Sequence, residues 1–429
     1  IPASAKLACL GFMIFGCGTE MAGITVSKAI VKWFTGKEMA LAMGLEMAIA
    51  RLGVFAVFSL SPWVAELGSP SVVRPVAVVG VLLCIGLLTF LVFTVMDRKL
   101  DRQTGAAAAA GEPEEQFKVS DLRRLFTSGT FLTVAALCVL YYSAIFPFQK
   151  YAVNMLQCNL TLVPPASDSF WASDTITIIQ YVIMIVVAAG SFAGNFAKEK
   201  GMKITMFSIA VIALVAYCFF GYMRQSAAAI FAVFPLLAVG ITPILGKYVD
   251  YKGKAASMLI IGALLLIACH LTFAFLLPML KGNDLGGVAL AYLTILVLGA
   301  SFSLVPASLW PSVPKLVDSK IIGSAYALIF WIQNIGLWLF PLLIGKVLDN
   351  TNPQVVQAIA DKTMSAEEAA ISYNYTAPLV MLASLGVAAL VIGFILKALD
   401  KKKHLGLEEP NIKEPQGEIL ESEAATVEE

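Results

Sequence analysis

Two residues of opposite charge, Glu20 and Arg51, lie near the middle of two long apolar segments. Glu20 comes 13 residues before Trp33, and Arg51 comes 14 residues after Lys37. As antiparallel membrane helices, the two segments would hold both charges ~20 Å from the same surface, at about 1.5 Å per residue. A charge at that depth is costly, so a functional role is the first interpretation. The pair could bind the charged ends of a small zwitterion, or it could be a structural ion pair between two helices.

Other polar residues within apolar segments extend this candidate site. Tyr142, Trp310 and Asn334 carry polar atoms that need partners away from water, so we predict that they line a cavity. The alternative is that they only hydrogen-bond neighbouring helices together. Glu46, in the segment of Arg51, and His270, within "IACHLT", are candidates for carrying a proton or tuning the site. Both also have a structural interpretation, since Glu46 could face a vestibule and a lone histidine often bonds between helices.

No residue pattern predicts an enzyme, a cofactor or a metal centre. The sequence has no HExxH, no Ser/His/Asp set and no nucleotide-binding loop, and its seven cysteines are scattered without a CxxC pair. The net charge is +1, and no basic patch with interleaved aromatic residues indicates a nucleic-acid partner. The chemistry that remains is reversible binding of a small molecule.

The composition predicts an all-α integral membrane protein. Hydrophobic residues make up 59% of the 429 residues and charged residues only 14%, against roughly 25% in soluble domains. Apolar runs long enough to cross a ~30 Å hydrocarbon core recur along the chain. We predict eleven spans, at about 5–33, 39–64, 72–96, 130–153, 175–196, 203–223, 226–247, 255–279, 287–313, 320–346 and 374–398.

Lysine and arginine concentrate at alternate ends of these spans. One side has 21 of them and the other has 6, which predicts that the first side is cytosolic. The segment 98–128 is polar and low in complexity, and it is expected to be a cytosolic linker. Residues 401–429 are expected to form a disordered acidic tail, also in the cytosol.

The segment "GKYVDYKGK", residues 246–254, fits the pattern G-x-x-x-D-x-x-G-[RK]. It resembles the loop between the second and third helices of each half in the major facilitator superfamily. We expect Gly246 to allow close helix approach, Asp250 to cap the start of the next helix, and Gly253 and Lys254 to complete a loop that takes part in conformational switching.

The helix count departs from that superfamily in two ways. Only three spans precede the linker, so residues 1–97 are expected to be the remainder of an N-terminal helical half whose first three helices are missing. Four spans lie between the linker and the motif where two are expected. We assign the surplus to an inserted hairpin, 175–223, within a C-terminal half at 129–400.

Five sequence blocks carry a closer resemblance: "GCGTE", "WFTGKEMALAMGLEMAIARLG", "YYSAIFPF", "SLVPASLWPSVPKLV" and "GSAYALIFWIQNIGLWLFPLLIGKVLD". Together they resemble the lysosomal dipeptide transporter family and its bacterial relatives. The resemblance implies a carrier of dipeptides that works by alternating access without ATP, in which Glu20 and Arg51 bind the amino and carboxylate ends of the peptide. It implies a glycosylated partner only for animal members, and nothing in this sequence speaks to an accessory subunit.

The expected location is therefore a bacterial inner membrane, with the C-terminus in the cytosol. Two other functions stay open. A carrier of organic anions or drugs would need Arg51 alone for charge recognition, and a receptor or scaffold could keep the carrier fold without transport.

Overall fold

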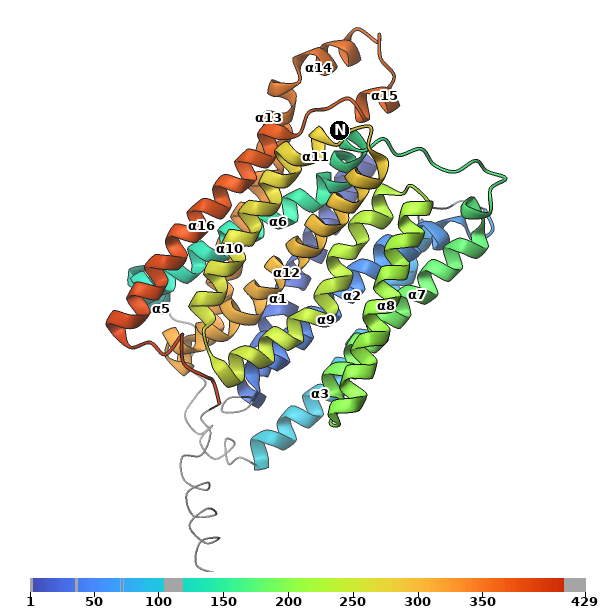
Figure 1. The fold of residues 1–429 in the computed structure, drawn as a ribbon. Helices are drawn as coiled ribbons and strands as arrows, with labels where there is room; N and C mark the ends of the chain where they lie inside the picture. Colours follow the sequence, from blue (N-terminus) through green and yellow to red (C-terminus); the bar gives the residue numbers. More distant parts are fainter. Residues whose placement is uncertain (1–2, 35–37, 70, 72, 104–118, 413–429) are drawn as a thin grey trace, which may run out of the picture.

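The computed structural model describes residues 3–34, 38–69, 71, 73–103 and 119–412, and these contain helices and no strand (Figure 1). The all-α prediction is confirmed. Eleven of the described helical segments are long and apolar enough to cross a membrane. They are α1 (Ala3–Phe34), α2 (Met39–Glu66), α3 (Val73–Gln103), α6 (Gly129–Asn159), α7 (Asp174–Phe196), α8 (Lys200–Met223), α9 (Ala227–Lys252), α10 (Ala255–Leu271) with its continuation to Met279, α12 (Asp284–Leu316), α13 (Ile322–Thr351) and α16 (Thr376–Lys403).

Several of these helices begin where a short polar side chain satisfies a free backbone N–H group. Ser128 accepts a hydrogen bond from the N–H of Phe131 at the start of α6, and Ser226 accepts one from Ala229 at the start of α9. Asn283 does the same for α12. Such caps are worth roughly 1 kcal/mol each, and they fix the first residue of the helix.

Small residues let α2 and α9 approach each other closely. A Cβ atom on Gly44 of α2 would stand 2.9 Å from the carbonyl oxygen of Thr242 and 3.2 Å from the Cα of Pro243. In the other direction, a Cβ atom on Gly246 of α9 would collide with the backbone of Ala40. Backbone meets backbone here, so the contact has no flexible side chain that could yield to an added methyl group.

The helices α7 and α8 form a hairpin at the edge of the bundle, beside α9 (Figure 1). Gly190 of α7 brings its backbone against Met206 and Ala210 of α8, and Gly240 of α9 receives Ser191 of α7. The outward faces of both helices are apolar and exposed, as expected for surfaces in contact with lipid. The assignment of this hairpin as an insertion stays a prediction.

Lysines mark one end of the bundle, which we call the lysine-rich end. There α1, α3, α9 and α16 finish, at Phe34, Gln103, Lys252 and Lys403, and α2 begins at Met39. Two short helices, α14 (Pro353–Ala360) and α15 (Ala366–Ala370), lie at the opposite end (Figure 1).

The predicted linker is only partly irregular. The helix α3 runs to Gln103, and residues Val119–Thr127 form an amphipathic helix, α5, that packs on α6 and α13. Residues 104–118 lie outside the described residues.

The predicted tail is also partly wrong. The helix α16 extends to Lys403, and residues 404–412 fold back against the ends of α9 and α12. Leu407 is completely buried, which an acidic composition alone did not suggest. We call residues 404–412 the C-terminal strap. Residues 413–429, the rest of the predicted disordered tail, lie outside the described residues.

The α2–α9 contact predicts opposite outcomes for two glycines of the same helix. Gly44→Ala should destabilise the protein by about 1–3 kcal/mol, because the new methyl group meets rigid backbone. Gly53→Ala should be neutral or stabilising by up to about 1 kcal/mol, because no atom lies within 4 Å of the added Cβ and alanine favours a helix. Thermal unfolding of both variants in the same detergent measures this. Equal midpoints for the two would show that α2 and α9 are not in close contact.

Candidate functional site

Arg51 lies on α2 with its guanidinium against two aromatic rings that also contact each other. It is 6% exposed, and its guanidinium carbon is 4.4 Å from the ring centroid of Phe302 and 5.1 Å from that of Phe146. Ring faces attract a cation by roughly 0.5–2 kcal/mol each. Within the described part of the chain, the guanidinium forms neither a salt bridge nor a hydrogen bond. Arg51 is therefore a buried cation whose donors have no anionic acceptor.

Tyr142 lies close to Arg51, and Trp310 packs on Tyr142. Trp310 Nε1 donates a hydrogen bond of 3.1 Å to the Tyr142 hydroxyl, and the Tyr142 ring contacts both Phe146 and Phe302. The Trp310 ring stacks on Phe330 of α13, with centroids 4.9 Å apart. The structure thus brings together three of the five predicted binding residues, from α2, α6 and α12.

Glu20 is not joined to Arg51 in this conformation. Its side chain is half-buried on α1, and among the described residues it forms no ion pair. Gly23 lies about one turn after Glu20 on α1, and a Cβ atom added to Gly23 would stand 3.7 Å from the ring of Phe330. Asn334 lies one turn beyond Phe330 on α13, so Glu20 and Asn334 stand at a similar level on neighbouring helices.

Asn334 keeps part of its hydrogen-bonding capacity. Its side-chain NH₂ group donates to the carbonyl oxygen of Phe330 at 3.0 Å, and the side chain is half-buried. An amide has two donors and one acceptor oxygen, so groups remain for a ligand.

Glu46 and His270 lie in different surroundings. Glu46 is half-buried on α2, close enough to Tyr142 and Tyr326 to interact with both electrostatically. It therefore belongs to the region of Arg51. His270 is fully buried on α10, with Nδ1 2.9 Å from the carbonyl oxygen of Leu266 and its ring edge-on to Phe148. These contacts resemble those of a packing histidine, and its predicted proton role is untested.

Phe146 and Phe302 are the site residues that the sequence analysis missed. Both are apolar residues in apolar segments, so their composition carries no signal. Phe146 lies four residues after Tyr142 and hence on the same helix face, which could have identified it. Phe302 lies eight residues before Trp310, two turns away on α12.

Asp250 forms the centre of a contact at the lysine-rich end. Its carboxylate, which is fully buried, accepts hydrogen bonds from the N–H groups of Ala40 at 2.9 Å and Leu41 at 2.7 Å. These are free donors at the start of α2, where the helix dipole also favours a negative charge. The expectation that Asp250 caps the next helix in sequence, α10, is wrong. It caps α2 instead, because the backbone turns sharply at Gly253 and Lys254, with φ of +71° and +69°.

The C-terminal strap, rather than Asp250, accepts hydrogen bonds from the backbone N–H groups at the start of α10. The backbone N–H groups of Lys254 and Ala255 donate to the carbonyls of Glu408 and Leu407, at 3.1 Å each. Asn411 of the strap donates to the Asp250 carboxylate at 2.8 Å. A Cβ atom on Gly253 would collide with the strap backbone, so this glycine is required both for its positive φ and for the close approach.

The buried contacts of α2 with α9 close the lysine-rich end between these helices. Tyr251 of α9 also donates to Glu38, which precedes α2, at 2.8 Å. Gly246 and Asp250 thus both face the first turn of α2. The loop motif, its glycine contact and the strap form one connected unit, which we call the α2 latch: Gly246, Asp250, Gly253, Lys254 and residues 404–412.

The sequence of the chain is similar to those of known proteins. A family profile described as "Major Facilitator Superfamily" matches residues 2–232, more than half of the chain. Similar curated proteins are named "Lysosomal dipeptide transporter MFSD1", from Bos taurus and Homo sapiens, both 26% identical over 348 residues, and from Danio rerio, 24% identical over 348 residues. The alignments cover 79% of this chain and 58% or 59% of the relatives. The chain thus spans about three fifths of their length.

The geometry of the α2 latch predicts the effect of Asp250→Asn. The amide offers one acceptor oxygen where the carboxylate has two, and it places an NH₂ group against a backbone donor. The loss of a charge-assisted bond of about 1.5–3 kcal/mol should change the balance of open and closed states by about 10- to 100-fold. We expect a lower maximal transport rate with substrate affinity nearly unchanged, in proteoliposome uptake and binding assays.

The control is Asp168→Asn, in the exposed loop before α7, which should match the wild type. A loss of affinity as large as the loss of rate in Asp250→Asn would place Asp250 in the binding site and contradict its role in the latch.

Proposed function

Because the chain belongs to the Major Facilitator Superfamily, whose members move small molecules across membranes, we propose that it carries dipeptides or similar small zwitterions by alternating access. Membership of that superfamily indicates a multi-pass membrane transporter rather than an enzyme. The substrate class is our proposal. The observation that carries it is the buried guanidinium of Arg51, which lies against two aromatic rings and has no anionic partner among the described residues.

The proposed role of Arg51 is to bind the carboxylate of the substrate. A guanidinium and a carboxylate can form two parallel hydrogen bonds, which orient the ligand as well as neutralise both charges. The Tyr142 hydroxyl, which accepts from Trp310, keeps its own O–H available to donate to the same carboxylate. The names of the similar proteins support a dipeptide as the molecule that bears this group.

The proposed role of Glu20 is to bind the amino terminus. An extended dipeptide separates its two charges by ~7 Å, at about 3.5 Å per residue. A zwitterion of this kind needs charges that are held apart around a cavity, and Glu20 is on a different helix from Arg51 without being paired to it. Asn334, at a similar level to Glu20, is proposed to bind a peptide amide or carbonyl group.

The proposed switching element is the α2 latch. It holds the first turn of α2 against α9 and thereby closes the lysine-rich end, which we place in the cytosol on the distribution of lysine and arginine. Opening would break the hydrogen bonds of Asp250, while α2 carries Arg51 and Glu46 with it. Gly246 contributes through its close contact with Ala40 of α2, and Gly253 and Lys254 contribute by fixing the geometry of the turn after α9. We propose a bacterial inner membrane as the location.

A carrier of organic anions is the second candidate, and one observation favours it. The Arg51 guanidinium can bind an anion directly, whereas no contact between Glu20 and the residues around Arg51 indicates that both would bind one ligand. Competition for uptake by proteoliposomes, among dialanine, alanine and a monocarboxylate without an amine, separates the two candidates. A dipeptide carrier prefers dialanine, and an anion carrier does not require the amine. Absence of uptake of any of these solutes would favour a scaffold.

The dipeptide proposal predicts complementary defects for two single substitutions in the full-length protein. Glu20→Gln should weaken the binding of dipeptides that have a free amino terminus by about 10- to 100-fold, because one charge-assisted contact is worth about 1.5–3 kcal/mol. It should barely affect the binding of N-acetylated dipeptides. For the same reason, Arg51→Ala should weaken the binding of dipeptides that have a free carboxylate and leave the binding of C-amidated dipeptides almost unchanged. Binding competition with blocked and unblocked dialanine measures both ratios.

Arg51→Lys serves as the matched variant, because it keeps the charge and removes the planar fork. It should bind dialanine better than Arg51→Ala and less well than the wild type. If folded Glu20→Gln and Arg51→Ala proteins bind blocked and unblocked peptides in the wild-type ratio, the two charges do not recognise the termini.

A further inference from the structure

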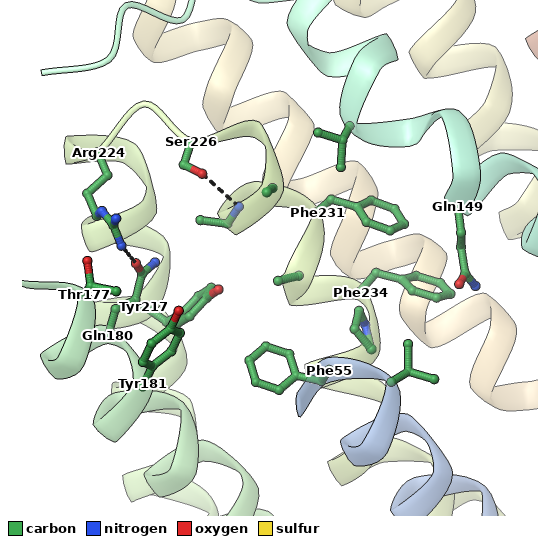
Figure 2. Close-up of a pocket in the computed structure, with 16 residues that line it drawn as sticks. Phe55, Gln149, Thr177, Gln180, Tyr181, Tyr217, Arg224, Ser226, Phe231 and Phe234 are labelled. Carbon is green, nitrogen blue, oxygen red and sulfur yellow. Dashed lines mark hydrogen bonds between the residues drawn. The ribbon is translucent and has the colours of Figure 1, made fainter. Parts of the chain in front are cut away.

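A pocket lies where the α7–α8 hairpin meets the helices of the bundle (Figure 2). Its volume is about 220 Å³, and α2, α6, α7, α8 and α9 all contribute to its walls. The hairpin side is polar and carries Gln180 and Arg224. The bundle side carries the rings of Phe55 and Phe234, with Gln149 of α6 beyond them.

The polar side chains of this pocket have hydrogen-bond donors without acceptors. Arg224 Nη1 donates to Gln180 Oε1 at 2.7 Å, which fixes the orientation of the Gln180 amide. Gln180 is 4% exposed, and its Nε2 group has no partner among the described residues. The Nε2 group of Gln149 is also buried without a partner in this part of the chain. An unsatisfied buried donor costs about 1–3 kcal/mol, so an acceptor at these positions would be stabilising.

The electrostatics of the pocket favour an anion. Arg224 is a permanent cation, and none of the described residues in the wall is acidic. Ser226, which caps the 26-residue helix α9, and Ala228 and Ala229 of its first turn line the pocket and add the positive end of a helix dipole. The aromatic wall accepts an apolar body. The matching ligand is a small solute with a carboxylate and a second acceptor oxygen, such as an amide carbonyl.

The pocket is adjacent to the Arg51 site. Phe55 lies one turn after Arg51 on α2. The ring of Phe234 lies 6.1 Å from that of Phe302, and Phe302 in turn covers the Arg51 guanidinium. Phe55, Phe234 and Phe302 thus lie between the two cationic groups, Arg224 and Arg51.

We propose that Arg224, Gln180 and Gln149 form an outer binding site for a small carboxylate solute. Arg224 and Gln180 bind its carboxylate, and Gln149 donates to its carbonyl oxygen from the opposite wall. A solute that enters at the end opposite the lysine-rich end occupies this site before it reaches Arg51. This order of occupation rests on the function proposed above, whereas carboxylate binding at Arg224 does not.

Protection of an introduced cysteine tests the outer site. Ala228→Cys in the full-length protein, with Cys9, Cys17 and Cys84 replaced by serine, adds a thiol to the exposed rim of the pocket. The rate of its reaction with a methanethiosulfonate reagent is measured in proteoliposomes. At a dialanine concentration about ten times its Kd, mass action leaves about a tenth of the sites free, so the rate should fall about tenfold. C-amidated dialanine should give no protection, and Ser167→Cys, in the exposed loop before α7, should react equally with and without dialanine.

Three further arms decide the assignment. Protection should persist in Arg51→Ala and disappear in Arg224→Gln, with Gln180→Met as a second variant if Arg224→Gln does not fold. Loss of protection in Arg51→Ala would show that the thiol reports the Arg51 site, and absence of protection by dialanine in the parent would likewise overturn the outer site. Neither result decides whether Arg51 recognises carboxylates, which the blocked peptides test separately.

The third arm varies the lipid. Vesicles with and without phosphatidylglycerol should give the same protection by dialanine. If the anionic lipid alone slows the reaction and dialanine adds nothing, the ligand of Arg224 is a lipid headgroup and the solute site is overturned.

Discussion

The burial of one positive charge constrains the centre of this structure. Arg51 is almost entirely removed from solvent, and a guanidinium in a membrane interior is stable only when its charge is compensated. Among the described residues, the compensation consists of two ring faces and the nearby Tyr142, and no carboxylate pairs with Arg51. In the function proposed above, the aromatic residues around Arg51 have two roles. They lower the cost of the unliganded state, and they leave the guanidinium donors free for an anion.

The same helix connects this charge to the lysine-rich end. Asp250 holds Ala40 and Leu41 at the start of α2, and Arg51 lies ten residues after Leu41, ~15 Å along the helix at about 1.5 Å per residue. The glycines Gly44 and Gly246 allow direct backbone contact between α2 and α9, and Arg51 lies on the same helix as Gly44, two turns further along. The C-terminal strap adds Asn411 to this contact, where it donates a hydrogen bond to the Asp250 carboxylate.

The sequence predicted the elements well because membrane helices depend on local composition. The eleven spans and the all-α bundle of the major facilitator superfamily are confirmed. Errors occurred where a long-range contact decides the outcome. Asp250 caps α2, 209 and 210 positions earlier in the chain, and Leu407 is buried by a turn that no local pattern predicts. Phe302 was missed for the same reason, since an apolar residue in an apolar helix gives no sign of the cation that it covers.

The most direct test of this account is an experimental structure of the full-length protein with dialanine bound. We expect the ligand carboxylate within hydrogen-bonding distance of the Arg51 guanidinium, with the amino group directed toward Glu20 and the rings of Phe146 and Phe302 still against Arg51. A ligand bound elsewhere, or an Arg51 that stays covered by both rings with no contact to the carboxylate, would contradict the central claim that Arg51 is held without an anion so that the substrate can supply one.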